Sequence, residues 1–491
     1  MWDLVIGLIA LPFLLLIFSW LKNYREWKHI MTIPGPKTYP IIGTLMEVLF
    51  NSDDLFYIDR QQWKIFEPIF KLWTFNLYVV NIMSAEDIEL VLNNTKHNEK
   101  SNIYSFLHSW LGTGLLTSGG KKWQKRRKIL TPAFHFSILQ EFVNIFNKET
   151  ENLVKVLENE SHQPYTNVLK PITEYTLYSI GETSLGVDLS KGNSSYKKAI
   201  YDFGEIITKR TIQPWLHNNL IFYMSGLGRK EDNIVKELHD FSAKVIKDRK
   251  GLFLTNGQMS YSHRKRLAML DLLLKAKYEG ADIDDEGIRE EVDTFMFEGH
   301  DTTSMGICFA LMALANEEKI QEEILQEIND TLGDSDRAPT YNELMEMKFM
   351  ERCVKECLRL YPSVPFIARV AGEDVKTHSG YTIPKGCDIN IYIYDLHRST
   401  RYWDNPEKFD PDRFLPENIA TRHPFAYLPF SAGSRNCIGQ RFAILEIKAA
   451  LCGILRKFKL LPVDTPQQMK YKTDLVLRPN GEVRVKFMLR N

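Results

Sequence analysis

The sequence has few cysteines, and none of them has the spacing of a zinc-binding or disulfide-rich domain. Its 491 residues include six cysteines, of which Cys353 and Cys357 are separated by only four positions in a predicted helix. A secreted domain stabilised by disulfides would carry more cysteines in a much shorter chain. We interpret Cys353 and Cys357 as small apolar residues packed in a helix.

The sequence also has no excess of either charge and no complete nucleotide-binding signature. The formal net charge is +0, so no overall field favours nucleic acid or an acidic substrate. The segment from Gly112 to Thr117 lacks the third glycine of the dinucleotide fingerprint, and Gly114 to Lys121 misses the phosphate-loop spacing by one residue. Any electrons that this protein uses must therefore come from a separate protein.

One long uncharged run stands out, from Leu4 to Leu21. As a helix it would rise roughly 27 Å, nearly the thickness of the hydrocarbon core of a membrane. A cleavable signal peptide is the alternative, but no cleavage site of small residues follows the run. Lys22, Arg25 and Lys28 come directly after it, which places the following chain in the cytosol. We predict an uncleaved membrane anchor over residues 1–22.

The remainder is predicted to be a linker and one large domain. Residues 23–43 are basic and rich in proline and glycine, which stiffens the backbone. Residues 44–491 show mostly helical patterns and no second linker, so we expect a mainly α fold with small β-sheets (α+β). The predicted helices cover residues 84–94, 121–129, 137–158, 166–184, 197–211, 231–249, 284–316, 317–332, 341–360 and 440–457. The predicted strands cover residues 69–80, 387–393 and 483–488.

The segment from Phe430 to Gly439 has the parts needed to hold a metal by one thiolate. Gly433 and Gly439 flank Cys437 and let backbone N–H groups approach its sulfur. A helical pattern begins just after Gly439, and its positive end would stabilise an anionic sulfur. A buried structural cysteine in a glycine-rich loop is the alternative interpretation.

This segment resembles the haem-binding motif of the cytochrome P-450 superfamily, which are haem-thiolate monooxygenases. The pattern Phe-x-x-Gly-x-Arg-x-Cys-x-Gly is matched in full, and the resemblance covers about residues 30 to 491. It implies the cytochrome P-450 fold and haem (iron protoporphyrin IX) with Cys437 as the axial ligand. Phe430 would cover the ring, and Gly433 and Gly439 would shape the loop.

The resemblance also implies the source of electrons. The cosubstrates would be O2 and NADPH, with electrons delivered by a separate NADPH-cytochrome reductase and cytochrome b5 as a second candidate donor. The substrate would be a lipid-like small molecule, and no nucleic acid would bind.

Asp301 and Thr302 lie within a long helical pattern, where an acid beside a hydroxyl is a poor choice for stability. By resemblance they are the catalytic pair that organises water and delivers protons to the distal side of the haem. The alternative is that the Thr302 hydroxyl bonds only to its own helix.

Glu298 lies four residues before Thr302, on the same helix face. Its surrounding string, Phe-x-Phe-Glu-Gly-His-Asp-Thr-Thr, resembles the fourth family of the superfamily, whose members hydroxylate fatty-acid chain ends. The resemblance implies that Glu298 can form an ester with a haem methyl group. A salt-bridged or solvated glutamate is the alternative.

Further residues are assigned to support of the haem by the same resemblance. Glu356 and Arg359 are neighbours on a helix and, with Arg413, would form a buried charged triad that holds the cysteine loop. Buried haem propionates need cations or hydrogen-bond donors. The candidates for that role are Trp123, Arg127, Arg369 and Arg435.

Two surfaces complete the expected site. Basic residues on the helix that carries Trp123 would form a docking face for an acidic electron donor, unless they are only a solvated surface. They are Lys121, Lys122, Lys125, Arg126 and Lys128. Substrate contacts are expected from residues 104–116, 201–227, 297–303, 364–367 and 475–478, with Lys209 and Arg210 as candidates for holding a carboxylate.

The predicted function is therefore an NADPH-dependent monooxygenase of the endoplasmic reticulum membrane, acting on fatty acids or similar lipids near the chain end. The overall sequence is similar to insect members of the branch, which could instead oxidise hormones, hydrocarbons or xenobiotics. Two other classes remain as alternatives: a reductase-independent haem-thiolate isomerase or dehydratase, and a non-catalytic haem sensor or carrier.

Overall fold

The computed structural model describes residues 14, 17, 24–39, 42–46, 55–74, 77–190, 194–255, 268–333, 335–472 and 474–490. Their contacts divide the chain into two compact units. The first unit comprises the described residues up to Tyr104 together with Pro365–Asp404 and Arg422–Asn436. The second unit comprises Ser105–Val364, Asn405–Thr421 and the described residues from Cys437 onward.

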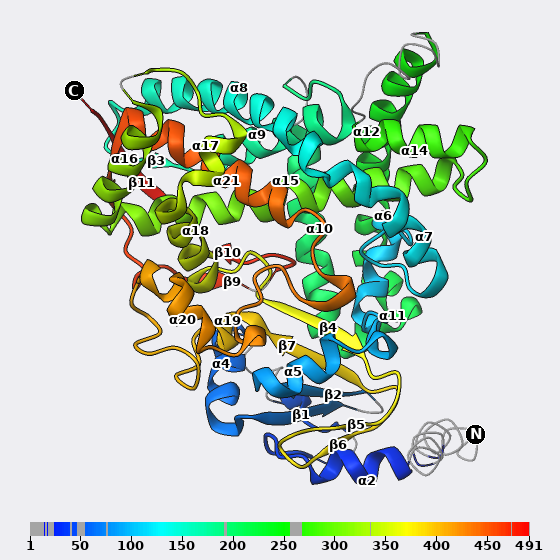
Figure 1. The fold of residues 1–491 in the computed structure, drawn as a ribbon. Helices are drawn as coiled ribbons and strands as arrows, with labels where there is room; N and C mark the ends of the chain where they lie inside the picture. The colour runs from blue at the N-terminus through cyan, green and yellow to red at the C-terminus, as the bar shows by residue number, and fades with distance from the viewer. Residues whose placement is uncertain are drawn as a thin grey trace. The chain divides into compact units, whose positions relative to one another are not determined.

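The first unit is built on a four-stranded sheet of order β1-β2-β7-β4 (Figure 1). Strand β2 pairs in parallel with β7, and the other two pairings are antiparallel. Trp63, Phe70, Met83 and Tyr392 form a buried apolar cluster beside it. The strands are β1 (Ile69–Thr74), β2 (Leu77–Ile82), β7 (Asp388–Tyr392) and β4 (Phe366–Val370).

Short helices and a β-hairpin complete this unit. Helix α5 (Ala85–Leu92) begins at Ser84, whose side chain accepts a hydrogen bond from the Asp87 backbone N–H, as expected of an N-cap residue. The other elements are α2 (Tyr24–Thr32), α4 (Leu55–Phe66), α19 (Ile393–Leu396), β5 (Val375–Lys376) and β6 (Thr382–Ile383).

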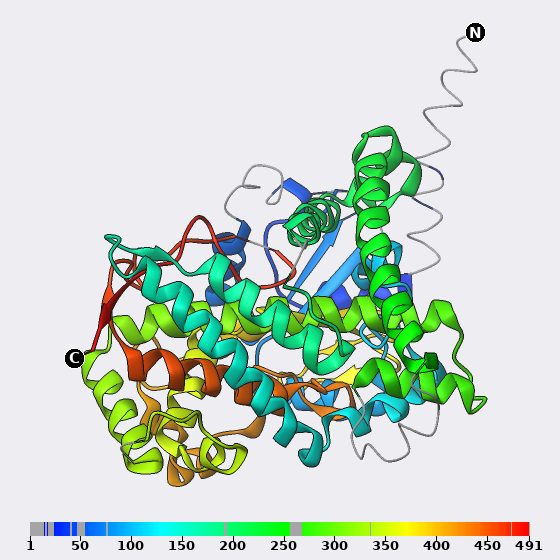
Figure 2. The ribbon, with the colours of Figure 1, turned by 90° about the horizontal axis from the view of Figure 1, so that it is seen from above.

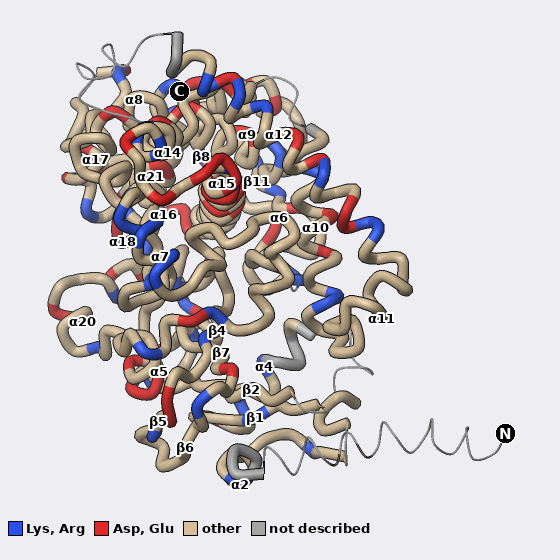
Figure 3. Tube along the Cα trace, turned by 90° about the vertical axis from the view of Figure 1, so that its right-hand side faces the viewer, with Lys and Arg blue, Asp and Glu red and all other residues tan. Residues whose placement is uncertain are grey.

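The second unit is helical, and α15 (Asp285–Ala315) is its central element. Almost every residue of α15 is buried, which is the pattern of a helix surrounded on all sides. Figure 3 looks along its axis, and α9, α12 and α21 pack against it. These neighbours are α9 (Leu169–Ile180), α12 (Leu227–Thr255) and α21 (Gln440–Lys457).

Other helices and two small sheets fill out the second unit. Helix α8 (Phe136–Glu160) packs against both α9 and α21 (Figure 2). One sheet has the order β3-β11-β8 and the other pairs β10 with β9. The remaining helices are α6 (His108–Leu111), α7 (Gly120–Leu130), α10 (Ser194–Ile212), α11 (Asn219–Met224), α14 (Met269–Tyr278), α16 (Glu318–Leu332), α17 (Tyr341–Glu346), α18 (Lys348–Leu360) and α20 (Pro416–Ala420). The strands are β3 (Thr166–Asn167), β8 (Phe458–Pro462), β9 (Tyr471–Lys472), β10 (Arg478–Pro479) and β11 (Arg484–Leu489).

The predicted helical fold with small sheets is confirmed, but three segments differ from their predictions. The predicted helix 166–184 begins with strand β3, and α9 starts only at Leu169. The predicted strand 69–80 is two strands, β1 and β2, paired antiparallel. The predicted helix 341–360 is broken at Met347, where α17 ends and α18 begins. Glu327 of α16 explains the break, because its carboxylate accepts the backbone N–H groups of Phe349 at 2.7 Å and Met350 at 2.8 Å.

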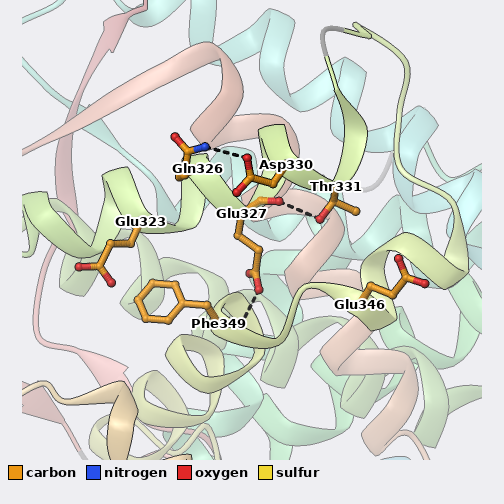
Figure 4. A pocket seen from close by; sticks show the side chains of 7 residues that line it. All are labelled: Glu323, Gln326, Glu327, Asp330, Thr331, Glu346 and Phe349. Carbon is orange, nitrogen blue, oxygen red and sulfur yellow. Dashed lines mark hydrogen bonds between the residues drawn. The ribbon is translucent and has the colours of Figure 1, made fainter.

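Glu327 belongs to an acidic hollow on α16, α17 and α18 (Figure 4). Figure 4 shows its carboxylate directed at Phe349 on the first turn of α18. Negative charge is favourable at a helix N-terminus, so this acid supports the start of α18. The hollow is lined by Glu323, Gln326, Glu327, Asp330, Thr331, Glu346 and Phe349.

The predicted membrane anchor over residues 1–22 lies outside the described part of the chain, apart from Leu14 and Ile17. Among the described residues, no helix is both long and apolar enough to cross a membrane. The predicted linker covers residues 23–43. It is helical over Tyr24–Thr32 and has no regular secondary structure over residues 33–38.

Candidate functional site

After its first turn, helix α15 is covered by other parts of the protein except along one short stripe of its surface. From Glu290 to Ala315 every residue is buried except Glu298, Gly299 and Thr302, which are partly exposed. Residues at i, i+1 and i+4 share one helix face, so the three form a single opening. Gly299 lies close to α9, since a Cβ there would be 2.5 Å from Ile180 Cδ1. Glu298 and Thr302, two of the residues predicted on the distal side of the haem, lie on this stripe, whereas Asp301 is buried.

Cys437 directly precedes α21, and its surroundings link it to α15 and α7. Its side chain is exposed, yet burial of its sulfur among protein atoms raises the pKa of the thiol to about 11. The charge of Glu298 raises this pKa further, while the Gly439 backbone N–H and Arg127 lower it. A side chain that is accessible but poorly hydrated faces a concave part of the protein. The structure therefore brings Cys437, Glu298 and Arg127 together around one space.

Helix α7 contributes the predicted propionate partners on this side. Trp123 is buried, and Arg127 is one helical turn further along the same face. Burial lowers the pKa of Arg127, and the proximity of Cys437 opposes that shift. Arg127 is a cation close to the predicted ligand sulfur. A haem has anionic propionates at the edge of its ring, and such a cation can pair with one of them.

These residues fit a haem. An accessible cysteine sulfur with a backbone N–H directed at it can ligate a soft metal centre as a thiolate. Arg127 can supply a charge for a propionate, and Glu298, Gly299 and Thr302 form a face of α15 that the protein leaves partly uncovered. Because burial favours the neutral thiol, a bound cation must displace its proton.

Thr302 and Asp301 are adjacent but engaged with different partners. The Thr302 hydroxyl donates a hydrogen bond to the Glu298 backbone oxygen at 2.7 Å. This is a bond within its own helix, as the alternative interpretation of Thr302 predicted. Asp301 is buried, and its carboxylate accepts a hydrogen bond from Arg478 Nη2 at 2.8 Å. From the sequence, Arg478 is expected only in a substrate segment, and its ion pair with Asp301 is not predicted.

The structure places the three residues of the predicted charged triad together in the second unit. Arg359 binds Glu356 through two hydrogen bonds, with Nε to Oε2 at 2.7 Å and Nη2 to Oε1 at 2.8 Å. Arg413 Nε lies 3.4 Å from Glu356 Oε1, and the Asp410 backbone N–H donates to the same oxygen at 2.8 Å. All three charged side chains are buried, so each depends on the others.

Four predicted haem contacts belong to the first unit. Arg369 is buried in β4 and donates to the Ala368 carbonyl at 3.0 Å, and burial lowers its pKa. Arg435 is buried and donates to the Asn98 carbonyl at 3.1 Å. Gly433 has a φ of 71°, and a Cβ there would lie 1.9 Å from Leu92 O, so only glycine fits. Phe430 is partly buried.

The predicted docking face on α7 needs correction. Arg126 is buried and directed at Glu290 and Glu291, at 3.9 Å and 3.8 Å. Lys122 pairs with Glu290 at 2.7 Å. Lys125 also has an acidic partner, while Lys121 and Lys128 are exposed. Three of the five basic residues therefore pair with acids of the same chain.

The two candidates for holding a substrate carboxylate also have partners within the chain. Lys209 pairs with Glu205 at 2.6 Å. Arg210 is buried, donates to the Leu216 carbonyl at 3.2 Å, and packs over the Phe222 ring at 4.0 Å. Arg210 thus closes the end of α10, and neither residue stands ready to bind a ligand.

Comparison with known proteins matches residues 33–487 to the family model described as Cytochrome P450. The relative "Cytochrome P450 4c3" of Drosophila melanogaster is 42% identical, over 97% of this chain and 93% of that protein. "Cytochrome P450 4V2" of Homo sapiens is 40% identical, over 95% and 91%. "Cytochrome P450 4c21" of Blattella germanica is 38% identical, over 99% of each.

A solved structure agrees with these sequence relatives. The "Crystal structure of cytochrome P450DA heme domain" superposes with a TM-score of 0.78 at 26% sequence identity, covering 94% of this chain and 97% of that one.

Proposed function

Since this chain belongs to the cytochrome P450 family and is a haem monooxygenase, we propose that it hydroxylates fatty acids or related lipids at or near the chain end. The observation that carries this proposal is the position of Glu298. It lies on the open stripe of α15 and close enough to Cys437 to raise the pKa of its thiol. A carboxylate at that position belongs to the string that resembles the lipid-hydroxylating branch.

The haem would be held by Cys437 through iron, with Arg127 and Trp123 at a propionate. In the first unit, Arg369 and Arg435 are further propionate candidates, and Phe430 and Gly433 belong to the cysteine loop. When bound, haem supplies the activation of dioxygen and the transfer of one oxygen atom to a C–H bond. The chain itself supplies the thiolate, cations for the propionates and a water-poor helix face.

Proton handling is assigned to Thr302 and Asp301. The Thr302 hydroxyl, which rests on the Glu298 carbonyl, can rotate to hold a water on the open stripe. Asp301 is buried next to it and can pass a proton from the interior to that hydroxyl. Residues of the triad, Glu356, Arg359 and Arg413, keep the second unit in shape and take no part in the chemistry.

We further propose that residues 1–22 anchor the protein in the endoplasmic reticulum membrane with the catalytic domain, residues 44–491, in the cytosol. NADPH-cytochrome reductase, with cytochrome b5 as a second donor, would supply electrons. A long apolar substrate could then reach the enzyme from the membrane itself. The same chemistry on a hormone, hydrocarbon or xenobiotic is the second candidate, because the relatives named above share the family and not a stated substrate.

The test is turnover of the full chain in lipid with NADPH and its reductase. Fatty acids of graded length are offered, and the products are identified by mass spectrometry. We expect hydroxylation at or next to the terminal carbon. Products from a lipid hydroperoxide without NADPH would instead indicate an isomerase or dehydratase, and no NADPH use with any lipid would indicate a sensor.

The cysteine ligand has its own test. Cys437→Ala should abolish the long-wavelength Soret band of the reduced carbon-monoxide complex, since that band requires a thiolate ligand. Cys452→Ala, a buried cysteine of the same helical region, should retain it. Retention of the band in Cys437→Ala would remove the ligand assignment.

A further inference from the structure

The partner of Asp301 is part of a buried cluster with more acids than bases. Arg478 donates to Asp301 Oδ2 from Nη2 at 2.8 Å and to Asp474 Oδ2 from Nε at 2.7 Å. Its guanidinium also lies 4.2 Å from the centre of the Tyr201 ring. All three charged side chains are almost fully buried. One guanidinium therefore donates hydrogen bonds to two carboxylates inside the second unit.

Arg478 remains the charged member of this cluster. Burial acts to lower its pKa, but attraction to Asp301 and Asp474 outweighs burial, and the pKa of Arg478 is raised. Burial raises the pKa of Asp474, and Asp301 adds to that shift while Arg478 opposes it.

Few other titratable groups act on Asp301. Those that interact with it are Arg478, Asp474, Tyr196, Tyr201 and His300. Burial raises the pKa of both tyrosines and lowers that of His300, so all three are neutral near pH 7. Arg478 is the one cation in this group.

The segment that carries Arg478 also reaches Thr302. The Leu477 backbone N–H donates to the Ser363 carbonyl at 2.8 Å. The Ser363 hydroxyl donates in turn to the Thr302 carbonyl at 2.7 Å. The short segment from Asp474 to Arg478 therefore contacts Asp301 directly and Thr302 through one residue.

Arg478 has one further donor group available. Its Nη1 is buried and has no hydrogen-bond partner among the described residues. A third carboxylate here would add negative charge to a cluster that already has two acids, so this donor is suited to water or a neutral oxygen. This argues against Arg478 as the site that binds a substrate carboxylate.

We propose that Arg478 is a positioning residue that holds the Asp301 carboxylate in the orientation in which it relays protons to the distal side of the haem. The inference rests on the proposed function, in which Asp301 handles protons. A buried carboxyl without its cation favours the neutral form. The loss of Arg478 would therefore favour the protonated form of the buried carboxyl and change the pH dependence of the proton relay.

The test compares how tightly NADPH use is coupled to product formation across pH in the full chain. In Arg478→Gln, the pH dependence of product per NADPH should shift upward by about 1–3 pH units. Arg478→Lys keeps the positive charge but cannot reproduce both hydrogen bonds to Asp301 and Asp474. It should shift the pH dependence less than Arg478→Gln does. Arg484→Gln is the matched control, because Arg484 pairs with Asp464 at a more exposed position.

An infrared measurement gives a readout that does not depend on turnover. Near neutral pH, Arg478→Gln/Asp474→Asn should show a protonated-carboxyl band that is absent from Asp474→Asn and lost when Asp301→Asn is added. If Arg478→Gln is poorly folded, Arg478→Gln/Asp474→Asn removes one buried acid together with the base. The same pH shift is expected there.

The outcomes distinguish the positioning role of Arg478 from the proton-relay role of Asp301. If Asp301→Asn changes the coupling but Arg478→Gln keeps the pH profile and Arg478→Gln/Asp474→Asn shows no new band, Arg478 is not a positioning residue. If Asp301→Asn leaves the coupling unchanged at every pH, the proton role of Asp301 itself is wrong. An upward shift together with the new band supports the inference.

Discussion

At the scale of single residues, the sulfur of Cys437 is set up to bind a cation. With a thiol pKa of about 11, the metal-free side chain carries a proton at neutral pH. Metal ligation requires the thiolate, so binding of iron must displace this proton. The Gly439 N–H and Arg127, which lower the pKa, make the displacement easier.

Glu298 leads to a prediction about attachment of the haem. If its carboxylate forms an ester with a haem methyl, the bond forms by oxidation of that methyl during turnover with O2. After turnover, acidic organic solvent should then leave part of the haem on the unaltered protein and remove all of it from Glu298→Ala. Haem content is measured by absorbance of the extracted and retained fractions. Complete extraction from the unaltered protein would show that no tether exists.

The buried triad predicts that substitution of two glutamates of α18 will reduce the stability of the protein by very different amounts. Glu356→Gln should destabilise the protein by about 3–5 kcal/mol, because two buried guanidinium groups lose their shared charge partner. Glu351→Gln should cost less than about 1 kcal/mol, since Glu351 pairs with Lys355 nearer the surface. Thermal unfolding of both variants measures the difference, and equal shifts would contradict it.

Residues within one motif could be predicted from the sequence, but their distant partners could not. Cys437 and Gly439 are two positions apart, so their contact follows from local geometry. Asp301 and Arg478 are 177 positions apart, and no local pattern marks them as a pair. Arg126 was misassigned for the same reason, because its basic neighbours suggested a surface while its acids lie on α15.

At the scale of elements, α15 is unusual in burying acids along its first half. Glu290, Glu291 and Asp293 are all buried there. Glu290 accepts from the Thr113 backbone N–H at 2.8 Å, and Glu291 accepts from the Leu115 N–H at 3.0 Å. The glycine-containing segment that fails as a nucleotide fingerprint is thus held against α15 by acids.

Glu291 predicts how stability depends on pH. Burial raises its pKa from 4.5 to about 7, although the Leu115 N–H and Arg126 oppose the shift. The folded protein therefore binds this proton more tightly than the unfolded chain. The stabilisation is present in full below pH 4.5 and is lost as the pH rises through 7.

The thermal midpoint should accordingly fall between about pH 5 and pH 7.5 by more than in Glu291→Gln. The difference in unfolding free energy should be on the order of 3 kcal/mol at most. Glu417→Gln, at an exposed position of α20, is the control and should follow the unaltered protein. Parallel curves for Glu291→Gln and the unaltered protein would show that Glu291 titrates normally.

The break between α17 and α18 shows why element boundaries escape sequence analysis. Residues 341–360 have a continuous helical pattern, yet Met347 leaves the helix. Its carbonyl accepts a hydrogen bond from Lys448 at 2.9 Å, and Glu327 accepts the N–H groups that follow. Both partners come from other helices, α21 and α16, so the local pattern contains no sign of them.

At the scale of the whole molecule, the fold class could be predicted because long helices dominate the pattern. The division into two units could not, because the first unit is assembled from three separate segments of the chain. Segments that meet only after folding leave no linker between them, and the absence of a linker suggested one undivided domain.

The predicted anchor gives a test on the full chain. Deletion of residues 2–22 should move the protein from the membrane pellet to the supernatant in high salt while the haem spectrum is retained. Under the proposed arrangement, the apolar run would supply the membrane affinity and the catalytic domain would begin after the linker. Substitution of Lys22, Arg25 and Lys28 by Gln is the companion variant, and it should leave the protein in the pellet. A deletion variant that stays in the pellet would show that other surfaces bind the membrane.

The position of β11 has a consequence for how the protein is made. This strand lies between β3, at residues 166–167, and β8, at residues 458–462. It is the last described element to leave the ribosome. Until then, the edges of β3 and β8 that pair with β11 have backbone groups without their hydrogen-bond partners. A nascent chain stalled before Arg484 should therefore depend on chaperones, and a premature stop codon there would leave β3 and β8 without the strand that pairs with both.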